Sequence, residues 1–141
     1  VFTVRAKDRA YVDQLVERLR QCAEGAALAS GAAATIEVRG RRQELQTNRY
    51  LSLIFSKNLA KLGEKTKKGT IRPFSTDMGD LSHEIPSIHP VISICDRPYG
   101  LHTQEFAEVA GSGRGFEVMI KAAKALAMTA VDILLAGGKE F

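Results

Sequence analysis

One stretch of the sequence restricts the fold more than any other, because it carries a helical repeat between two runs of strand-forming residues. From residue 8 onward, apolar residues recur at three- and four-residue steps: Val12, Leu15, Val16, Leu19, Cys22, Ala23, Ala26 and Ala27. Asp8 can cap the start of this helix and Gly31 can end it. The runs at 1–6 and 35–38 predict strands. Residues 1–39 are therefore predicted to form a strand-helix-strand unit, half of a small α+β sandwich that needs further strands for stability.

The rest of the chain predicts three more helices and one more β-rich run. Thr47 can cap a helix that stops at Gly63, after which a Lys- and Gly-rich stretch predicts a flexible linker. A β-rich run follows at 88–95, then a short helix from about Thr103 and a long helix that ends at Gly137-Gly138. The apolar faces of the first and last of these helices carry Leu51, Ile54, Phe55, Leu59 and Leu62, and Phe116, Met119, Ile120, Ala123, Leu126, Ala127, Ala130, Val131 and Leu134.

Charge and composition exclude several classes of protein. The formal net charge of +4 comes largely from two basic runs, made of Arg39, Arg41 and Arg42, and of Lys57, Lys61, Lys65, Lys67, Lys68 and Arg72. Few aromatic residues are interleaved with them, so solvated loops are favoured over a nucleic-acid site. No apolar stretch approaches the ~20 residues that span a bilayer, and no signal sequence is visible. The sequence predicts a soluble, cytoplasmic protein that binds neither nucleic acid nor membrane.

One segment concentrates the residues that carry chemistry. Between residues 75 and 105 lie all three histidines, His83, His89 and His102, among five carboxylates. Imidazole and carboxylate groups hold catalytic zinc, cobalt or manganese, so the composition fits a hydrolytic metal site. Cys22 and Cys95 have no CxxC partner, so no thiolate zinc site is indicated. Because there is no HExxH motif, the residue types leave open that the histidines only form hydrogen bonds in loops.

Two other kinds of site are disfavoured by their motifs. Ser75, Ser82 and Ser112 lie near histidines and aspartates, but no Gly-x-Ser-x-Gly elbow of a serine hydrolase is present. The glycines at 111, 113 and 115 follow a predicted helix instead of a strand, so they are not a dinucleotide-binding fingerprint.

Several blocks together resemble one family. The run STDMGDLSHEIPSIHP at 75–90 is similar to the distinctive block of the aminobenzoyl-glutamate hydrolase-like, peptidase-domain-containing subgroup. That subgroup belongs to the zinc-dependent amidohydrolases of the aminoacylase and carboxypeptidase G superfamily. LHTQEF at 101–106 and AAKALAMTA at 122–130 resemble its closing blocks, while 4–6 and 23–31 resemble the end of its lid domain. The resemblance covers nearly the whole chain.

This resemblance implies a two-domain α/β metallo-amidohydrolase with an inserted α+β lid that closes over substrate and mediates homodimerisation. Residues 1–42 would be the end of the lid, and residues 43–141 would be the C-terminal portion of the α/β catalytic domain. The implied reaction is hydrolysis of the amide bond in an N-acyl amino acid or dipeptide-like substrate. The implied cofactor is a pair of divalent metal ions, zinc first, with manganese or cobalt as alternatives.

The resemblance also implies roles for four residues of this chain. His102 falls on the family's last metal ligand, contributed after the lid insertion, and the alternative is a solvent-facing residue at a helix start. Arg5 falls on an arginine that binds the free carboxylate of the substrate, and the alternative is an ordinary exposed strand residue. Asp77 and His83 would line the mouth of the active site.

The resemblance is incomplete at the catalytic centre. The family's general-base glutamate and its other metal ligands come from a His-x-Asp segment and a Glu-Glu segment before the lid, and neither occurs in these 141 residues. One imidazole cannot hold a catalytic zinc, which needs about three protein ligands. We therefore expect the 141 residues alone not to hydrolyse amides. The alternative is a non-catalytic binding or interaction module derived from such an enzyme.

Overall fold

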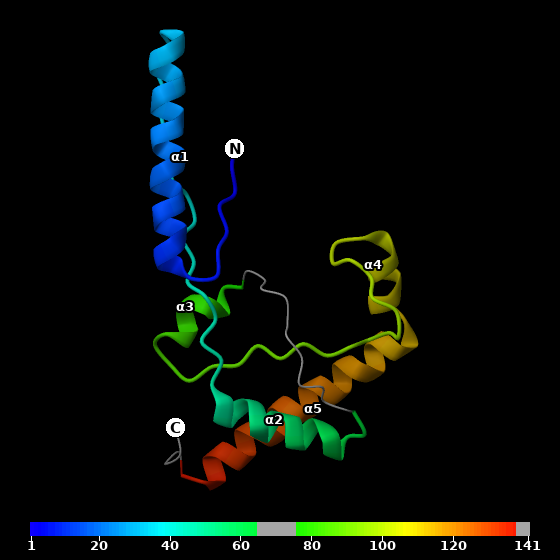
Figure 1. Ribbon diagram of the computed structural model, residues 1–141. Helices are drawn as coiled ribbons and strands as arrows, with labels where there is room; N and C mark the ends of the chain where they lie inside the picture. Colours follow the sequence, from blue (N-terminus) through cyan, green and yellow to red (C-terminus); the bar gives the residue numbers. More distant parts are fainter. Residues whose placement is uncertain (65–75, 138–141) are drawn as a thin grey trace. The chain divides into compact units, whose positions relative to one another are not determined.

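The computed structural model describes residues 1–64 and 76–137, and within them the secondary structure is helical (Figure 1). The described part of the chain forms two compact units. One contains residues 1–46 and 76–85, and the other contains residues 47–64 and 86–137. Three predicted features lie outside the described residues: the linker from residue 65 onward, Ser75 and Gly138.

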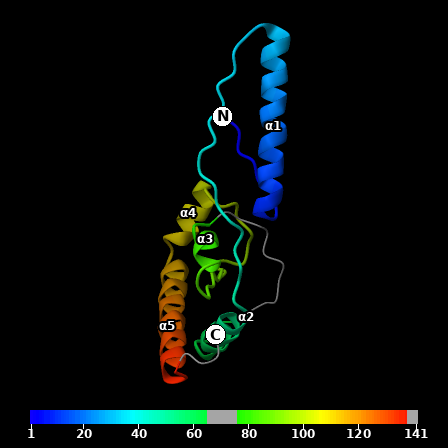
Figure 2. The ribbon, with the colours of Figure 1, turned by 90° about the vertical axis from the view of Figure 1, so that its left-hand side faces the viewer.

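Helix α1, Arg9–Ser30, is the predicted first helix. The carboxylate of Asp8 caps it by accepting a hydrogen bond of 2.8 Å from the backbone N–H of Tyr11, and Gly31 ends it with φ 71°. The chain then runs back along the helix (Figure 2). Both predicted caps are therefore confirmed.

The segments predicted as strands on either side of α1 have no strand partner among the described residues. Val4 and Ala6 are half-buried while Arg5 between them is exposed, and Ile36 and Val38 are half-buried around exposed Glu37. This alternation has the period of two that a strand shows when one face packs against a helix. A strand ladder also needs a neighbouring strand, and none of the described residues supplies one here.

The β-rich run at 88–95 behaves in the same way. Its even-numbered residues from Ile88 to Ile94 are half-buried, whereas Val91 and Ser93 are exposed. The β pairing among the described residues is one isolated parallel bridge, between Thr47 and Ser87. The α/β fold class therefore stays a prediction, which the alternating burial favours.

Helix α2 begins one residue later than its predicted cap implies. It spans Arg49–Lys61, and its cap is Asn48, whose side-chain oxygen accepts from the N–H of Leu51 at 3.0 Å. Thr47 instead takes part in the bridge to Ser87. The predicted apolar face is confirmed in part, since Leu51, Phe55 and Leu59 are buried.

The C-terminal part contains α4, Gln104–Ala110, and α5, Gly113–Leu135, and both were predicted. Thr103 caps α4 and Ser112 caps α5 through their hydroxyl groups. A shorter helix that precedes both, α3 at Met78–Ser82, is not predicted from the sequence. No helix of the described residues is long and apolar enough to cross a membrane.

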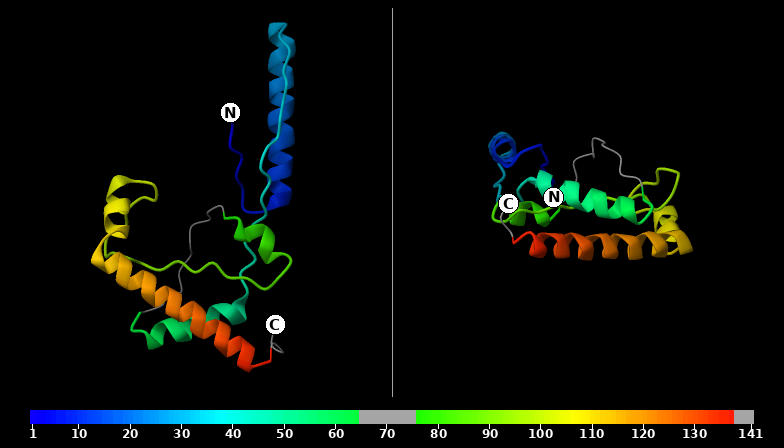
Figure 3. Two further views of the ribbon diagram at one scale, coloured as in Figure 1. Left: turned by 180° about the vertical axis from the view of Figure 1, so that it is seen from behind. Right: turned by 90° about the horizontal axis from the view of Figure 1, so that it is seen from below.

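The second unit is held together by the packing of α2 against α5, which lie side by side (Figure 3). Phe55, Leu59 and Ala125 form its core, and Leu62, Ile88 and Ile92 pack against them. Ala125 has no exposed surface, which lets the two helices approach closely. The apolar face predicted for α5 is wrong, because all nine of its residues are exposed. The buried residues of α5 are instead Gly115, Val118, Ala125 and Thr129, three of them small enough for a close approach of the backbones.

A buried polar network fixes the register of these two helices. The amide of Asn58, which is 1% exposed, donates to the hydroxyl of Thr129 at 3.3 Å and to the carboxylate of Asp132 at 2.8 Å. Its carbonyl accepts from Nζ of Lys61 at 2.9 Å, and Thr129 donates to the backbone oxygen of Ala125 at 2.7 Å. A sliding of one helix along the other would leave the buried amide of Asn58 without its partners on α5, which costs about 1–3 kcal/mol.

Charged residues join the end of α2 to the start of α5. Glu64 accepts hydrogen bonds of 2.9 Å from both Arg114 and Lys121, and these two residues also pair with Glu117. Arg114, and then Lys121, hold the pKa of Glu64 below its usual value. Lys121, and then Arg114, lower the pKa of Glu117.

We expect a Glu64→Gln variant to be less stable than the wild type at pH 7 and to lose part of this difference in acid. A carboxylate whose pKa is lowered by folding stabilises the protein above its unfolded-state pKa of about 4.5, and this contribution disappears as the pH falls through the folded-state value. Melting temperatures of both proteins between pH 7 and pH 3 measure the effect. Glu24→Gln, on the exposed surface of α1, is the control. A difference that stays constant over this range would contradict the expectation.

Candidate functional site

Residues 80–83 of the block that carries most of the family resemblance bind the backbone of residues 43–46 within the first unit. The carboxylate of Asp80 accepts from the N–H of Gln43 at 2.8 Å. The hydroxyl of Ser82 accepts from the N–H of Gln46 at 2.9 Å and donates to the backbone oxygen of Gly79 at 2.6 Å. These contacts join α3 to a segment more than 35 residues earlier in the chain.

Gly79 permits this close approach. A Cβ atom at residue 79 would overlap the backbone oxygen of Gln43 and lie 3.0 Å from its carbonyl carbon. Because the obstacle is backbone, a side-chain rotation could not relieve it. The glycine is therefore required by packing.

His83 completes this contact. Its Nε2 lies 3.0 Å from the backbone oxygen of Glu44, and its Nδ1 lies 3.2 Å from the amide nitrogen of Gln46. A neutral ring that donates from Nε2 and accepts at Nδ1 satisfies both partners. The structure thus gives His83 a role in holding residues 44–46, and its role toward substrate stays a prediction.

The other two predicted substrate contacts are open to solvent. Arg5 is exposed on the N-terminal segment, where its guanidinium can pair with a carboxylate. Asp77 is exposed at the start of α3, and its carboxylate accepts one long hydrogen bond of 3.4 Å from the hydroxyl of Thr76. Both side chains are available to a ligand.

His102 lies in the second unit, in the turn that precedes α4. It is exposed, and its φ of 67° makes it the one non-glycine residue with positive φ in the described part of the chain. The left-handed conformation costs roughly 1–2 kcal/mol for a residue that has a Cβ atom. An observed outlier of this kind is a reason to suspect a functional role.

The described residues do not form a complete metal site. No group of three or more His, Cys, Asp or Glu side chains among residues 1–64 and 76–137 could hold a metal ion. His102 offers one nitrogen ligand, whereas a catalytic zinc needs about three protein ligands.

The serine alternatives lose support from the positions of their hydroxyl groups. Ser82 is buried and bonded to backbone on both sides, and Ser112 caps α5 while donating to the backbone oxygen of Val109 at 2.7 Å. A nucleophilic serine needs a base within hydrogen-bond reach. Neither hydroxyl has an imidazole as its hydrogen-bond partner among the described residues.

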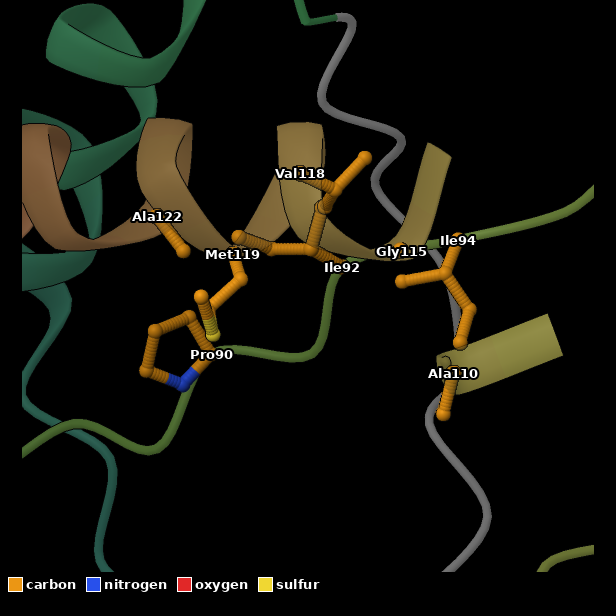
Figure 4. Close-up of a pocket in the computed structure, with 8 residues that line it drawn as sticks. All are labelled: Pro90, Ile92, Ile94, Ala110, Gly115, Val118, Met119 and Ala122. Carbon is orange, nitrogen blue, oxygen red and sulfur yellow. The ribbon is translucent and has the colours of Figure 1, made fainter. Parts of the chain in front are cut away.

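A pocket of about 350 Å³ lies beside α5 (Figure 4). Its lining comes from three elements and is apolar throughout: Pro90, Ile92, Ile94, Ala110, Gly115, Val118, Met119 and Ala122. None of the four predicted site residues lines it. With no acid, base or nucleophile in its wall, this pocket has no group that could catalyse hydrolysis.

The contacts of Asp80, Ser82 and His83 with residues 43–46 are not predicted from the sequence. No spacing in the sequence marks a contact between segments so far apart. Thr103, by contrast, is predicted as the start of a helix, and its hydroxyl is the cap of α4.

Comparisons with known proteins find two curated relatives. The chain is 33% identical over 141 residues to a human protein named Xaa-Arg dipeptidase, an alignment that covers 95% of this chain and 32% of the relative. It is 31% identical over 139 residues to the mouse Xaa-Arg dipeptidase, again over 95% of this chain and 32% of the relative. This chain thus spans about a third of the length of these relatives. No protein-family model and no solved structure matches it.

Proposed function

We propose that this chain is part of a metal-dependent amidohydrolase that cleaves the amide bond of a dipeptide or a similar N-acyl amino acid. The observation that carries the proposal is the similarity to two Xaa-Arg dipeptidases along 95% of the chain. It agrees with the independent resemblance of the 75–90 and 101–106 blocks to the amidohydrolases.

In this proposal the four candidate residues have separate tasks. His102 supplies one nitrogen ligand to a divalent metal ion, with zinc preferred and manganese or cobalt as alternatives. The guanidinium of Arg5 pairs with the free carboxylate of the substrate through two parallel hydrogen bonds. Asp77 and His83 line the mouth of the site, and His83 in addition binds the backbone oxygen of Glu44 within its own unit.

The remaining parts of the proposal concern the longer protein. The general base and the other metal ligands would come from residues outside these 141, and the protein would be a cytoplasmic homodimer that associates through its lid. The alternative is a binding module without catalysis. The described residues contain no cluster of three possible metal ligands, and such a module would need none.

The test is hydrolysis by the full-length protein that contains this chain. We expect it to cleave one or more members of a panel of dipeptides with C-terminal arginine, matched dipeptides with other C-terminal residues, aminobenzoyl-glutamate and N-acetylated amino acids. A chelator should abolish this activity and zinc or manganese should restore it. Tight binding of a dipeptide without any cleavage would favour the non-catalytic module, and chelator-resistant cleavage would contradict metal dependence.

A further inference from the structure

The turn that carries His102 is closed at both ends by one hydroxyl group. Oγ1 of Thr103 donates to the backbone oxygen of Gly100 at 3.0 Å and accepts from the N–H of Phe106 at 3.2 Å. A hydroxyl has one proton to donate and two lone pairs, so both bonds can form at once. The backbone is therefore fixed three residues before and three residues after Thr103, and His102 lies inside the fixed stretch.

The same pair of bonds occurs at the next helix without a left-handed residue. Oγ of Ser112 donates to the backbone oxygen of Val109 at 2.7 Å and accepts from the N–H of Gly115 at 3.1 Å. The preceding residue, Gly111, has a φ of −82°. A hydroxyl cap of this kind thus does not by itself require the conformation that His102 adopts.

His102 is a residue for which this conformation is unfavourable, since it carries a Cβ atom. Such a conformation persists only where the surrounding structure over-determines it. The two hydrogen bonds of Thr103 tie down the backbone on both sides of His102. Such bonds do not dictate a left-handed residue, but here they hold the stretch that contains one, and the direction in which the Cα–Cβ bond of His102 leaves the chain depends on that stretch.

We propose that Thr103 is a positioning residue for His102: its hydroxyl holds the turn in the left-handed form that aims the imidazole. This role rests on the proposed function, in which His102 binds the divalent metal ion.

The test compares Thr103→Val, which keeps the shape and loses the hydroxyl, with Thr103→Ser, which keeps the hydroxyl. In the full-length protein we expect Thr103→Val to lower kcat/KM for a dipeptide about 10-fold or more, as the loss of an orienting partner does. Thr103→Ser should recover most of the activity. Ser112→Ala, which breaks the matching pair of bonds at α5, should stay within about threefold of the wild type.

A double-mutant cycle separates positioning from general destabilisation. If Thr103 acts through His102, Thr103→Val should have no further effect on kcat/KM in a His102→Gly background. An equal loss in both backgrounds, or a loss for Ser112→Ala as large as that for Thr103→Val, would overturn the proposal.

A crystal structure of Thr103→Val gives a readout that does not depend on activity. We expect the φ of His102 to leave the left-handed region, and a value still near 67° would overturn the positioning role. If the wild-type protein cleaves no amide, the proposed function fails, and this structure still decides whether Thr103 holds His102.

Discussion

A His102→Gly variant of the full-length protein is expected to lose about 100-fold or more of its kcat/KM for a dipeptide while keeping its melting temperature. Glycine adopts a φ of 67° without a penalty, so the backbone of the turn can stay as it is. The substitution removes the imidazole and little else, because the ring makes no hydrogen bond or ion pair with the other described residues. Hydrolysis rates and thermal denaturation of the same preparations measure both effects.

The controls for this experiment come from the same turn. Gln104 lies two residues after His102, is exposed, and donates from its side-chain amide to the carboxylate of Glu108 at 3.1 Å. The Gln104→Ala variant should therefore remain active. His102→Ala places a Cβ atom back on the left-handed backbone and should match the activity loss of the glycine variant with a slightly lower melting temperature. Retention of activity within about threefold in His102→Gly would remove His102 from the metal site.

The helices could be predicted because their signals are local. Apolar residues at three- and four-residue steps were enough to find α1 and α5, and Thr103 was enough to mark the start of α4. They did not give the buried face of α5, because which face is covered depends on the helix that packs against it. The start of α2 shows the limit of such signals. Thr47 and Asn48 are both acceptable caps, and the bridge of Thr47 to Ser87, 40 residues away, decides in favour of Asn48.

The short helix α3 could not be predicted from periodicity, since its five residues make little more than one turn. Its residues also have a second task that the sequence does not show. Asp80, Ser82 and His83 bind backbone atoms of residues 43–46, so side chains that look suited to chemistry are used to hold another segment. Composition can propose ligands, but only the fold shows which polar atoms are already paired.

The predicted strands differ from the helices in what they require. A helix satisfies its backbone within one segment, whereas a strand depends on neighbours that can lie anywhere in the protein. The alternating burial of residues 4–6, 36–38 and 90–94 has the period of a strand, and the described residues lack the partners that would complete it. The relatives are about three times as long as the aligned segment.

Two glycines in the first turn of α5 should respond in opposite ways to the same substitution. A Cβ at Gly115 would overlap the backbone oxygen of Ala110 and lie 2.8 Å from that of Val109, so Gly115→Ala must push α4 and α5 apart. We expect it to destabilise this region by about 3 kcal/mol, in the upper range for an overpacked site. A Cβ at Gly113 would meet nothing within 4 Å.

Gly113→Ala is therefore the matched control, and it should be neutral or stabilising by about 0.5–1 kcal/mol because alanine loses less backbone entropy in a helix. Amide hydrogen exchange over 104–135, followed by mass spectrometry, measures the local opening in each variant. Faster exchange in Gly115→Ala alone would show that the packing of α4 against α5 depends on backbone contact at residue 115. Equal exchange in both variants would mean that the two helices can separate at residue 115 without cost.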